Sequence, residues 1–155
     1  MLEEELAPIV RATRVDHVWH AGLTMLGVAA ALGRPDLAFA MPTPATRWSP
    51  DVGAELAGAF RDLAQDAVPA QGSIQAGVDA LTRNGFLWHA NQVRVLGALA
   101  LTRVAPGDEA AELARAADDW FAGIGATGWS AVARGVLRRL GRRAPSRLGS
   151  GSGDL

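Results

Sequence analysis

The side chains that could perform catalysis or hold a metal ion are few and are spread along the chain. His17 and His20 lie one helical turn apart, so both imidazoles could face a single metal ion, but no third or fourth ligand accompanies them. His89 could form a hydrolytic triad with Asp79 or Ser73, but no Gly-x-Ser-x-Gly turn presents a nucleophile. We therefore expect no catalytic residue, no metal site and no cofactor, and a protein that is not an enzyme.

Composition excludes several further classes of protein. The 155-residue chain contains no Cys and no Lys, which excludes a disulfide framework, a Cys-based zinc site and a lysine-containing phosphate-binding loop. A formal net charge of −1 does not supply the positive field of an autonomous nucleic-acid-binding protein. Arg, Asp, His or Gly interrupts every apolar stretch before the roughly eighteen residues that a membrane-spanning helix needs. Because Glu3, Glu4 and Glu5 stand where a secretory signal would be positive, we expect a cytoplasmic protein that does not contact the membrane.

The chain is rich in Trp, with five residues of this type. Trp120, Phe121 and Trp129 lie on apolar helical stripes and are expected in the core, whereas Trp19 and Trp88 each neighbour a His. An amphipathic ring beside polar groups is typical of recognition surfaces. The candidate residues for binding a ligand or partner belong to the segment 86–103: Trp88, His89, Asn91, Gln92 and Arg94. The alternative is that they form the solvated side that any surface helix keeps.

The clearest charge feature is a set of arginines near the end of the last expected helix: Arg134, Arg138, Arg139, Arg142, Arg143 and Arg147. Cations complement the dipole at a helix C-terminus, which accounts for part of this set without any function. The functional alternative is an electrostatic contact with an acidic neighbouring domain or, in a longer protein, with DNA phosphate. The candidates for that contact are Arg134, Arg138, Arg142 and Arg143.

Helical periodicity dominates the sequence and strand signals are nearly absent, which predicts an all-α fold. Apolar residues recur at spacings of three and four over 15–32, 51–68, 73–84, 86–103, 108–124 and 129–140, with a short helix over 36–41 and an extended connection up to Ser49. Gly33, Gly85 and Gly141 are stop signals. The segment 86–103 is apolar on more than one side, so we expect it at the centre.

Two Leu-Gly pairs suggest an internal repeat. Leu26-Gly27 and Leu96-Gly97 are each followed by an Ala/Leu-rich turn and then by a basic residue, Pro and Asp that open the next helix. Their separation is close to two periods of the roughly 34-residue tetratricopeptide unit, in which a small Gly lets paired helices approach closely. The sequence therefore predicts antiparallel helical hairpins stacked as a tetratricopeptide-like α-solenoid fragment over 1–145, followed by a flexible Ser/Gly linker over 146–155.

Four segments of the second half carry a resemblance to a known family: Leu96–Leu101, Ala116–Phe121, Gly128–Arg134 and Leu137–Pro145. In this order they resemble the last helical repeats of large LuxR-family transcription regulators of the MalT class, just before the helix-turn-helix domain. The resemblance implies an interaction and sensing domain that binds an effector or a protein partner, in a fragment that lacks the DNA-binding domain. DNA would be contacted only through that separate domain, and homo-oligomer formation is left open.

A second hypothesis comes from a different functional class. The chain could be a free-standing α-helical protein whose enclosed apolar pocket binds or modifies a small molecule, with Trp19, His20, Trp88 and His89 lining the pocket. A closed globule with a pocket between these four side chains would favour this hypothesis. An open concave stack of helices would favour the interaction domain.

Overall fold

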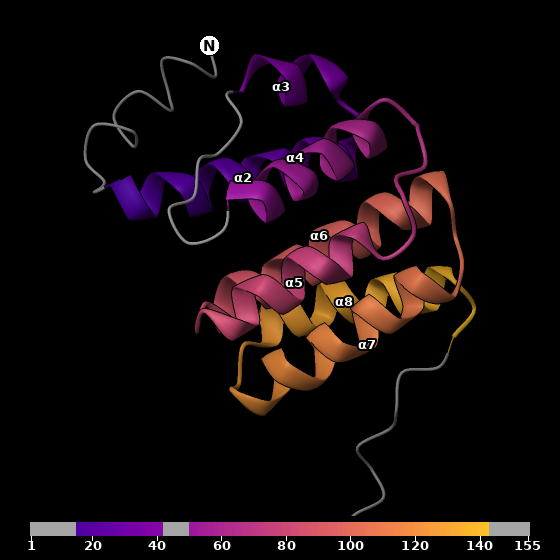
Figure 1. The fold of residues 1–155 in the computed structure, drawn as a ribbon. Helices are drawn as coiled ribbons and strands as arrows, with labels where there is room; N and C mark the ends of the chain where they lie inside the picture. Colours follow the sequence, from indigo (N-terminus) through magenta and orange to yellow (C-terminus); the bar gives the residue numbers. More distant parts are fainter. Residues whose placement is uncertain (1–14, 42–49, 143–155) are drawn as a thin grey trace, which may run out of the picture.

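The computed structural model describes residues 15–41 and 50–142, with the backbone alone for residues 15–19 and 50. Within these ranges the chain forms helices and no strand, which confirms the all-α prediction (Figure 1). The helices are α2 (Val15–Leu32), α3 (Pro35–Ala40), α4 (Pro50–Ala64), α5 (Ser73–Arg83), α6 (Leu87–Val104), α7 (Asp108–Gly123) and α8 (Thr127–Arg139). None of these helices is long and apolar enough to cross a membrane. The expected connection over 42–49 and the expected linker over 146–155, with the boundary before it, lie outside the described residues.

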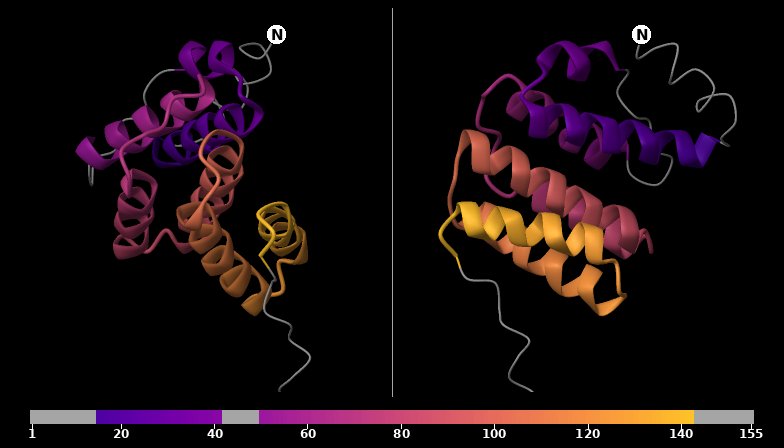
Figure 2. Two further views of the ribbon diagram at one scale, coloured as in Figure 1. Left: turned by 90° about the vertical axis from the view of Figure 1, so that its right-hand side faces the viewer. Right: turned by 180° about the vertical axis from the view of Figure 1, so that it is seen from behind.

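The helices pack as three successive layers, each made of two neighbouring helices (Figures 1 and 2). Helix α2 lies beside α4, α5 beside α6, and α7 beside α8, while the short α3 packs on α2 and α4. Helix α6 packs against α2, α4, α5, α7 and α8, so both of its faces are covered. The prediction that the segment 86–103 is central is therefore confirmed.

The C-terminal ends of α2, α4 and α6 meet at one guanidinium group. Arg103, in the last turn of α6, donates from Nη2 to the carbonyl oxygens of Ala30 and Leu63, at 3.0 and 2.5 Å. It also forms an ion pair with Asp66. A cation in this position satisfies carbonyls that the helices themselves leave free. Because three helix ends converge here, α2, α4 and α6 run in the same direction.

The first layer therefore differs from the antiparallel hairpin that was expected. Helices α2 and α4 are parallel, and the short α3, which packs on both, lies between them in the sequence (Figure 1). The pairs α5–α6 and α7–α8 are antiparallel hairpins, as predicted (Figure 2). In the second of these, Arg142 beyond the end of α8 pairs at 2.5 Å with Asp108 at the start of α7.

The helix boundaries follow local backbone requirements. Gly85 ends α5 with φ of 80°, a left-handed conformation that glycine adopts at little cost, as the sequence predicted. Helix α4 differs from the predicted segment 51–68 at both ends, because it begins one residue earlier and ends at Ala64. Helix α4 begins at Pro50, whose fixed φ and missing N–H suit the first turn, and Gly72 precedes α5.

Two helical glycines mark close approaches of α6 to its neighbours. A Cβ added at Gly27 of α2 would lie 2.8 Å from Cδ1 of Leu96 on α6. A Cβ added at Gly97 of α6 would lie 2.8 Å from Cγ2 of Ile74 on α5. Both separations are shorter than a van der Waals contact, so only glycine fits at these positions without a shift of the neighbour. The glycines of the two Leu-Gly pairs thus permit close helix packing, Gly97 within the α5–α6 pair and Gly27 between α2 and α6 of the neighbouring layer.

We predict that Gly97→Ala lowers the free energy of unfolding by about 1 kcal/mol or more, because overpacking costs about 1–3 kcal/mol and exceeds the gain in helix propensity. The stiff β-branched Ile74 cannot move aside by rotating a flexible end. Gly58 of α4 is the matched control, since a Cβ there would meet nothing within 4 Å. Gly58→Ala should raise stability by up to about 1 kcal/mol. Urea unfolding of both variants measures the difference, and equal effects would contradict the close approach.

Candidate functional site

Aromatic rings gather where α6 begins, α7 ends and α8 begins. Trp88 of α6 lies edge-on to Trp120 and Phe121 of α7, with ring centroids 6.1 and 5.3 Å away. Phe121 is fully buried and stacks against Trp129 of α8 at 5.6 Å. The antiparallel order of α6, α7 and α8 brings these helix ends together. Phe121 is therefore the centre of a ring cluster to which three helices contribute, apart from the main core.

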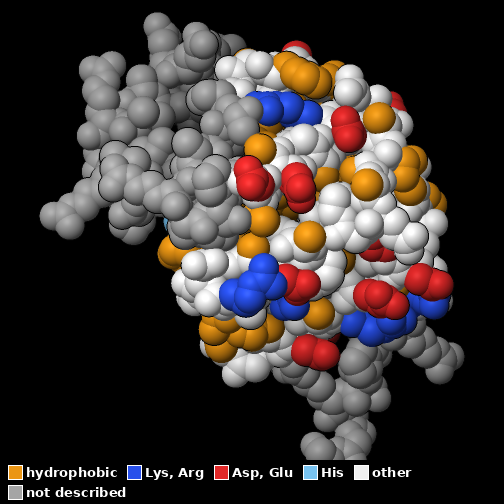
Figure 3. Space-filling view, in the orientation of Figure 1, with side chains coloured by type: hydrophobic (Ala, Val, Ile, Leu, Met, Phe, Trp, Pro, Cys, Tyr) orange, Lys and Arg blue, Asp and Glu red, His pale blue; other side chains and the backbone are white. Residues whose placement is uncertain are grey.

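Solvent reaches this ring cluster and two apolar residues close to it in the sequence. Leu87, Trp88 and Ile124 are 44%, 41% and 53% exposed, while Trp120 and Trp129 are half-buried. We refer to these five residues as the aromatic end. Figure 3 shows hydrophobic side chains gathered at the lower left of the described surface, where Figure 1 places the start of α6 and the end of α7. Exposed apolar residues that gather on one part of a surface are candidates for a binding site.

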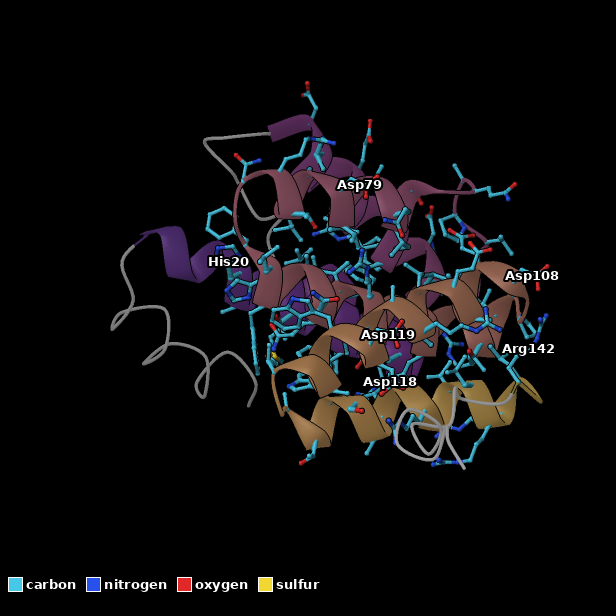
Figure 4. All side chains as sticks on the ribbon, turned by 90° about the horizontal axis from the view of Figure 1, so that it is seen from below. His20, Asp79, Asp108, Asp118, Asp119 and Arg142 are labelled. Atoms are coloured by element: carbon cyan, nitrogen blue, oxygen red, sulfur yellow. The ribbon has the colours of Figure 1, made fainter. Side chains whose placement is uncertain are left out.

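Two stacked histidines join α2 to α6 beside the aromatic end. The imidazole rings of His20 and His89 are parallel within 5°, with centroids 3.8 Å apart, and His20 is buried (Figure 4). His20 also lies edge-on to Phe86 at 4.6 Å. Trp88 contacts α7 whereas His89 contacts α2, so these two candidates for the Trp/His pocket take part in different interhelical contacts. The side chain of Trp19 lies outside the described residues.

The other predicted contact residues of α6 form two separate sets of hydrogen bonds within that helix. Asn91 is buried, donates to a backbone carbonyl one turn earlier at 2.8 Å and accepts from Arg94 Nη1 at 2.8 Å. His89 Nδ1 lies 3.2 Å from Gln92 Oε1. Burial holds the pKa of Arg94 below its usual value, and the negative charge of Asp79 acts in the opposite direction. Asn91 is thus an internal group, while Gln92 and Arg94 keep part of their surface in solvent.

A buried carboxylate that sequence reasoning missed joins α7 to α8. Asp118 is 2% exposed, accepts a hydrogen bond from Ser130 Oγ, and has each of its oxygens 3.1 Å from Arg134 Nε (Figure 4). A carboxylate in this position is tolerated because both a hydroxyl and a guanidinium satisfy it. The signal that could have revealed it is its place on the apolar stripe of α7, four residues after Ala114 and three before Phe121.

The arginines predicted as electrostatic contacts do not form a uniform positive surface. Arg134 pairs with buried Asp118, and Arg142 pairs with Asp108 at 2.5 Å. Arg138 is exposed, and Arg143 lies outside the described residues. Figure 3 shows acidic and basic side chains next to one another at the lower right of the described surface. The net positive charge of this region is therefore smaller than the sequence suggested.

No group of three or more His, Asp or Glu in the described ranges is placed to hold a metal ion, and the side chain of His17 lies outside those ranges. Comparison with known proteins does not assign the chain to a family, because no protein-family model, no curated protein and no solved structure matches it. Function is therefore inferred from the chain's own residues.

Proposed function

We propose that this chain is the interaction and sensing module of a LuxR-type transcription regulator, a helical-repeat domain that binds a protein partner and passes its bound state to a separate DNA-binding domain. The observation that carries the proposal is the aromatic end. Trp88, Trp120 and Trp129, three of the five Trp residues of the chain, meet around one buried Phe, with their outer side open to solvent. Trp is enriched among the residues that dominate the energy of protein–protein binding.

The position of the aromatic end suggests how binding would be transmitted. Its rings connect α6, the central helix, to the α7–α8 hairpin, which forms the outermost layer of the stack. A partner that presses on Trp88 and Ile124 would bear directly on the packing of this hairpin against α6. A change in the angle of α8 would then reorient a DNA-binding domain attached after it. Such a change is a population shift between two packings of the α7–α8 hairpin on α6.

The resemblance to LuxR-type regulators favours the same region of the chain as the place where a partner binds. Two residues of the aromatic end, Trp120 and Trp129, lie in the segments Ala116–Phe121 and Gly128–Arg134, which resemble the last repeats of that family. In such regulators these repeats stand next to the domain that reads DNA. A surface at this position could therefore report a bound partner to the DNA-binding domain over a short distance.

The proposal is tested with the coding sequence that follows Leu155. A helix-turn-helix domain is expected there, and the protein that contains both parts is assayed for DNA affinity by fluorescence anisotropy. Leu87→Ser combined with Ile124→Ser removes exposed apolar surface and leaves the ring cluster intact. We expect this double variant to change DNA affinity by at least about fivefold, the lower range of allosteric coupling.

Val68→Ser is the matched control, because Val68 is 65% exposed on the connection between α4 and α5, away from the aromatic end. It should bind DNA as the wild type does. The absence of a helix-turn-helix domain after Leu155 would contradict the proposal that this chain is part of a transcription regulator. Equal DNA affinity of all three proteins would show that the aromatic end does not communicate with DNA binding.

A further inference from the structure

A pocket of about 410 Å³ opens beside the buried Asp118. Its lining residues come from one face of α8 and from one position of α7: Thr127, Ser130, Ala131, Arg134, Arg138 and Ala122. The two Ala side chains are small and leave room, while the charged groups that line the pocket are both guanidinium groups. A space with two cations and no lining carboxylate is suited to an anion.

Arg134 is held in one orientation by the carboxylate behind it. Its Nε lies 3.1 Å from both oxygens of Asp118, so this nitrogen is fully used. The terminal nitrogens Nη1 and Nη2 donate to no residue in the part of the chain that the structure describes. Because the side chain is 35% exposed and lines the pocket, these two nitrogens are accessible to a ligand.

Arg138 adds a second guanidinium one helical turn after Arg134. It is exposed and forms no ion pair with any described residue. Ser130 already donates its hydroxyl hydrogen to Asp118, so the groups left for a ligand are the two guanidinium groups and the hydroxyl of Thr127. All of these can donate hydrogen bonds.

We propose that this pocket binds the oxyanion group of a small molecule, a phosphate or a carboxylate. The planar guanidinium fork matches the spacing of two oxygens in either group and donates to both. Asp118 fixes the plane of the Arg134 fork before the ligand arrives, which reduces the ordering cost of binding. The site lies on the face of α8 next to α7 and does not depend on the aromatic end or on the proposed regulator.

The test is a titration of the full chain followed by amide chemical shifts in NMR spectra, with inorganic phosphate in one series and acetate in another, at ionic strength matched with sodium chloride. We expect saturable shift changes centred on residues 127–138 with at least one of the two oxyanions. Arg138→Gln should weaken that binding by at least about fivefold, since it removes a charge-assisted hydrogen bond. Arg139→Gln removes the same charge from the next residue, which does not line the pocket, and should stay within about twofold of wild type.

Three results would overturn the proposal. The first is a response to both oxyanions that does not saturate. The second is an equal loss of affinity in Arg138→Gln and Arg139→Gln, which would show only a general attraction of anions to α8. The third is binding of an oligo-glutamate peptide without binding of phosphate or acetate, which would assign the pocket to a protein side chain instead of a small molecule.

Discussion

Phe121→Ala is expected to lower the free energy of unfolding by about 3–5 kcal/mol, the cost of a large cavity in a tightly packed interior. Phe121 is fully buried, and its ring contacts Trp88, Trp120 and Trp129. Its loss would leave three indoles without their common neighbour. Chemical unfolding measures the change in stability, and Trp fluorescence of the folded variant should shift to longer wavelength because water reaches the rings.

Phe39→Ala on α3 is the matched control for this substitution. Phe39 is 57% exposed, so the same change in side-chain volume should alter stability by only about 0.5 kcal/mol. Trp emission should stay as in the wild type. If the two variants lost similar amounts of stability, Phe121 could not be the packing centre of the contact between α6 and the α7–α8 hairpin.

The end of α5 and the central place of α6 were predictable because they depend on local chemistry. Gly85 has a positive φ that few other residues adopt, so its position near the end of an apolar stripe indicates a helix terminus in any fold. The segment 86–103 carries apolar residues around most of its circumference, which requires neighbours on several sides. Neither inference needs knowledge of the partner helix.

Features that join distant segments were not predictable from one sequence. Arg103 of α6 binds the carbonyls of Ala30 and Leu63, and nothing in its own surroundings along the chain identifies these partners. The parallel direction of α2 and α4 is a consequence of the same long-range arrangement. The sequence does not distinguish Gly77 from other helical glycines either, although a Cβ there would lie 2.7 Å from Leu56 Cδ2.

The candidate site also combines features that depend on local sequence with features that depend on a distant segment. Trp88 was predicted as a contact residue and has exposed surface, since an aromatic residue in the first turn of a helix is easily reached by solvent. Asn91 is a contact candidate by its polarity, yet it is buried, and its amide forms hydrogen bonds with its own helix and with Arg94. The sequence around Asp118 does not reveal its role, because its partners Ser130 and Arg134 belong to the following helix. The role of a polar residue on an apolar stripe depends on the helix that packs against it, and the sequence of its own segment does not identify that helix.

Arg134→Met is expected to destabilise the fold by roughly 2–3 kcal/mol, since it leaves the Asp118 carboxylate buried with only the Ser130 hydroxyl as a partner. The full cost of breaking a buried ion pair is higher, but the Arg134 side chain is 35% exposed and water screens part of the interaction. Met preserves the packing of the aliphatic stem, so the change isolates the charged group. Thermal and urea unfolding at neutral pH measure the effect.

A double-mutant cycle with Asp118→Asn separates the charge pairing from other effects of the substitution. An amide has no negative charge to be compensated, so Arg134→Met should cost at least about 1 kcal/mol less in the Asp118→Asn background than in the wild type. Arg139→Met in both backgrounds is the reference, because Arg139 is exposed and forms no ion pair with any described residue. Additive losses would mean that the Asp118–Arg134 contact does not hold α7 to α8, and the oriented guanidinium on which the anion pocket depends would lose its support.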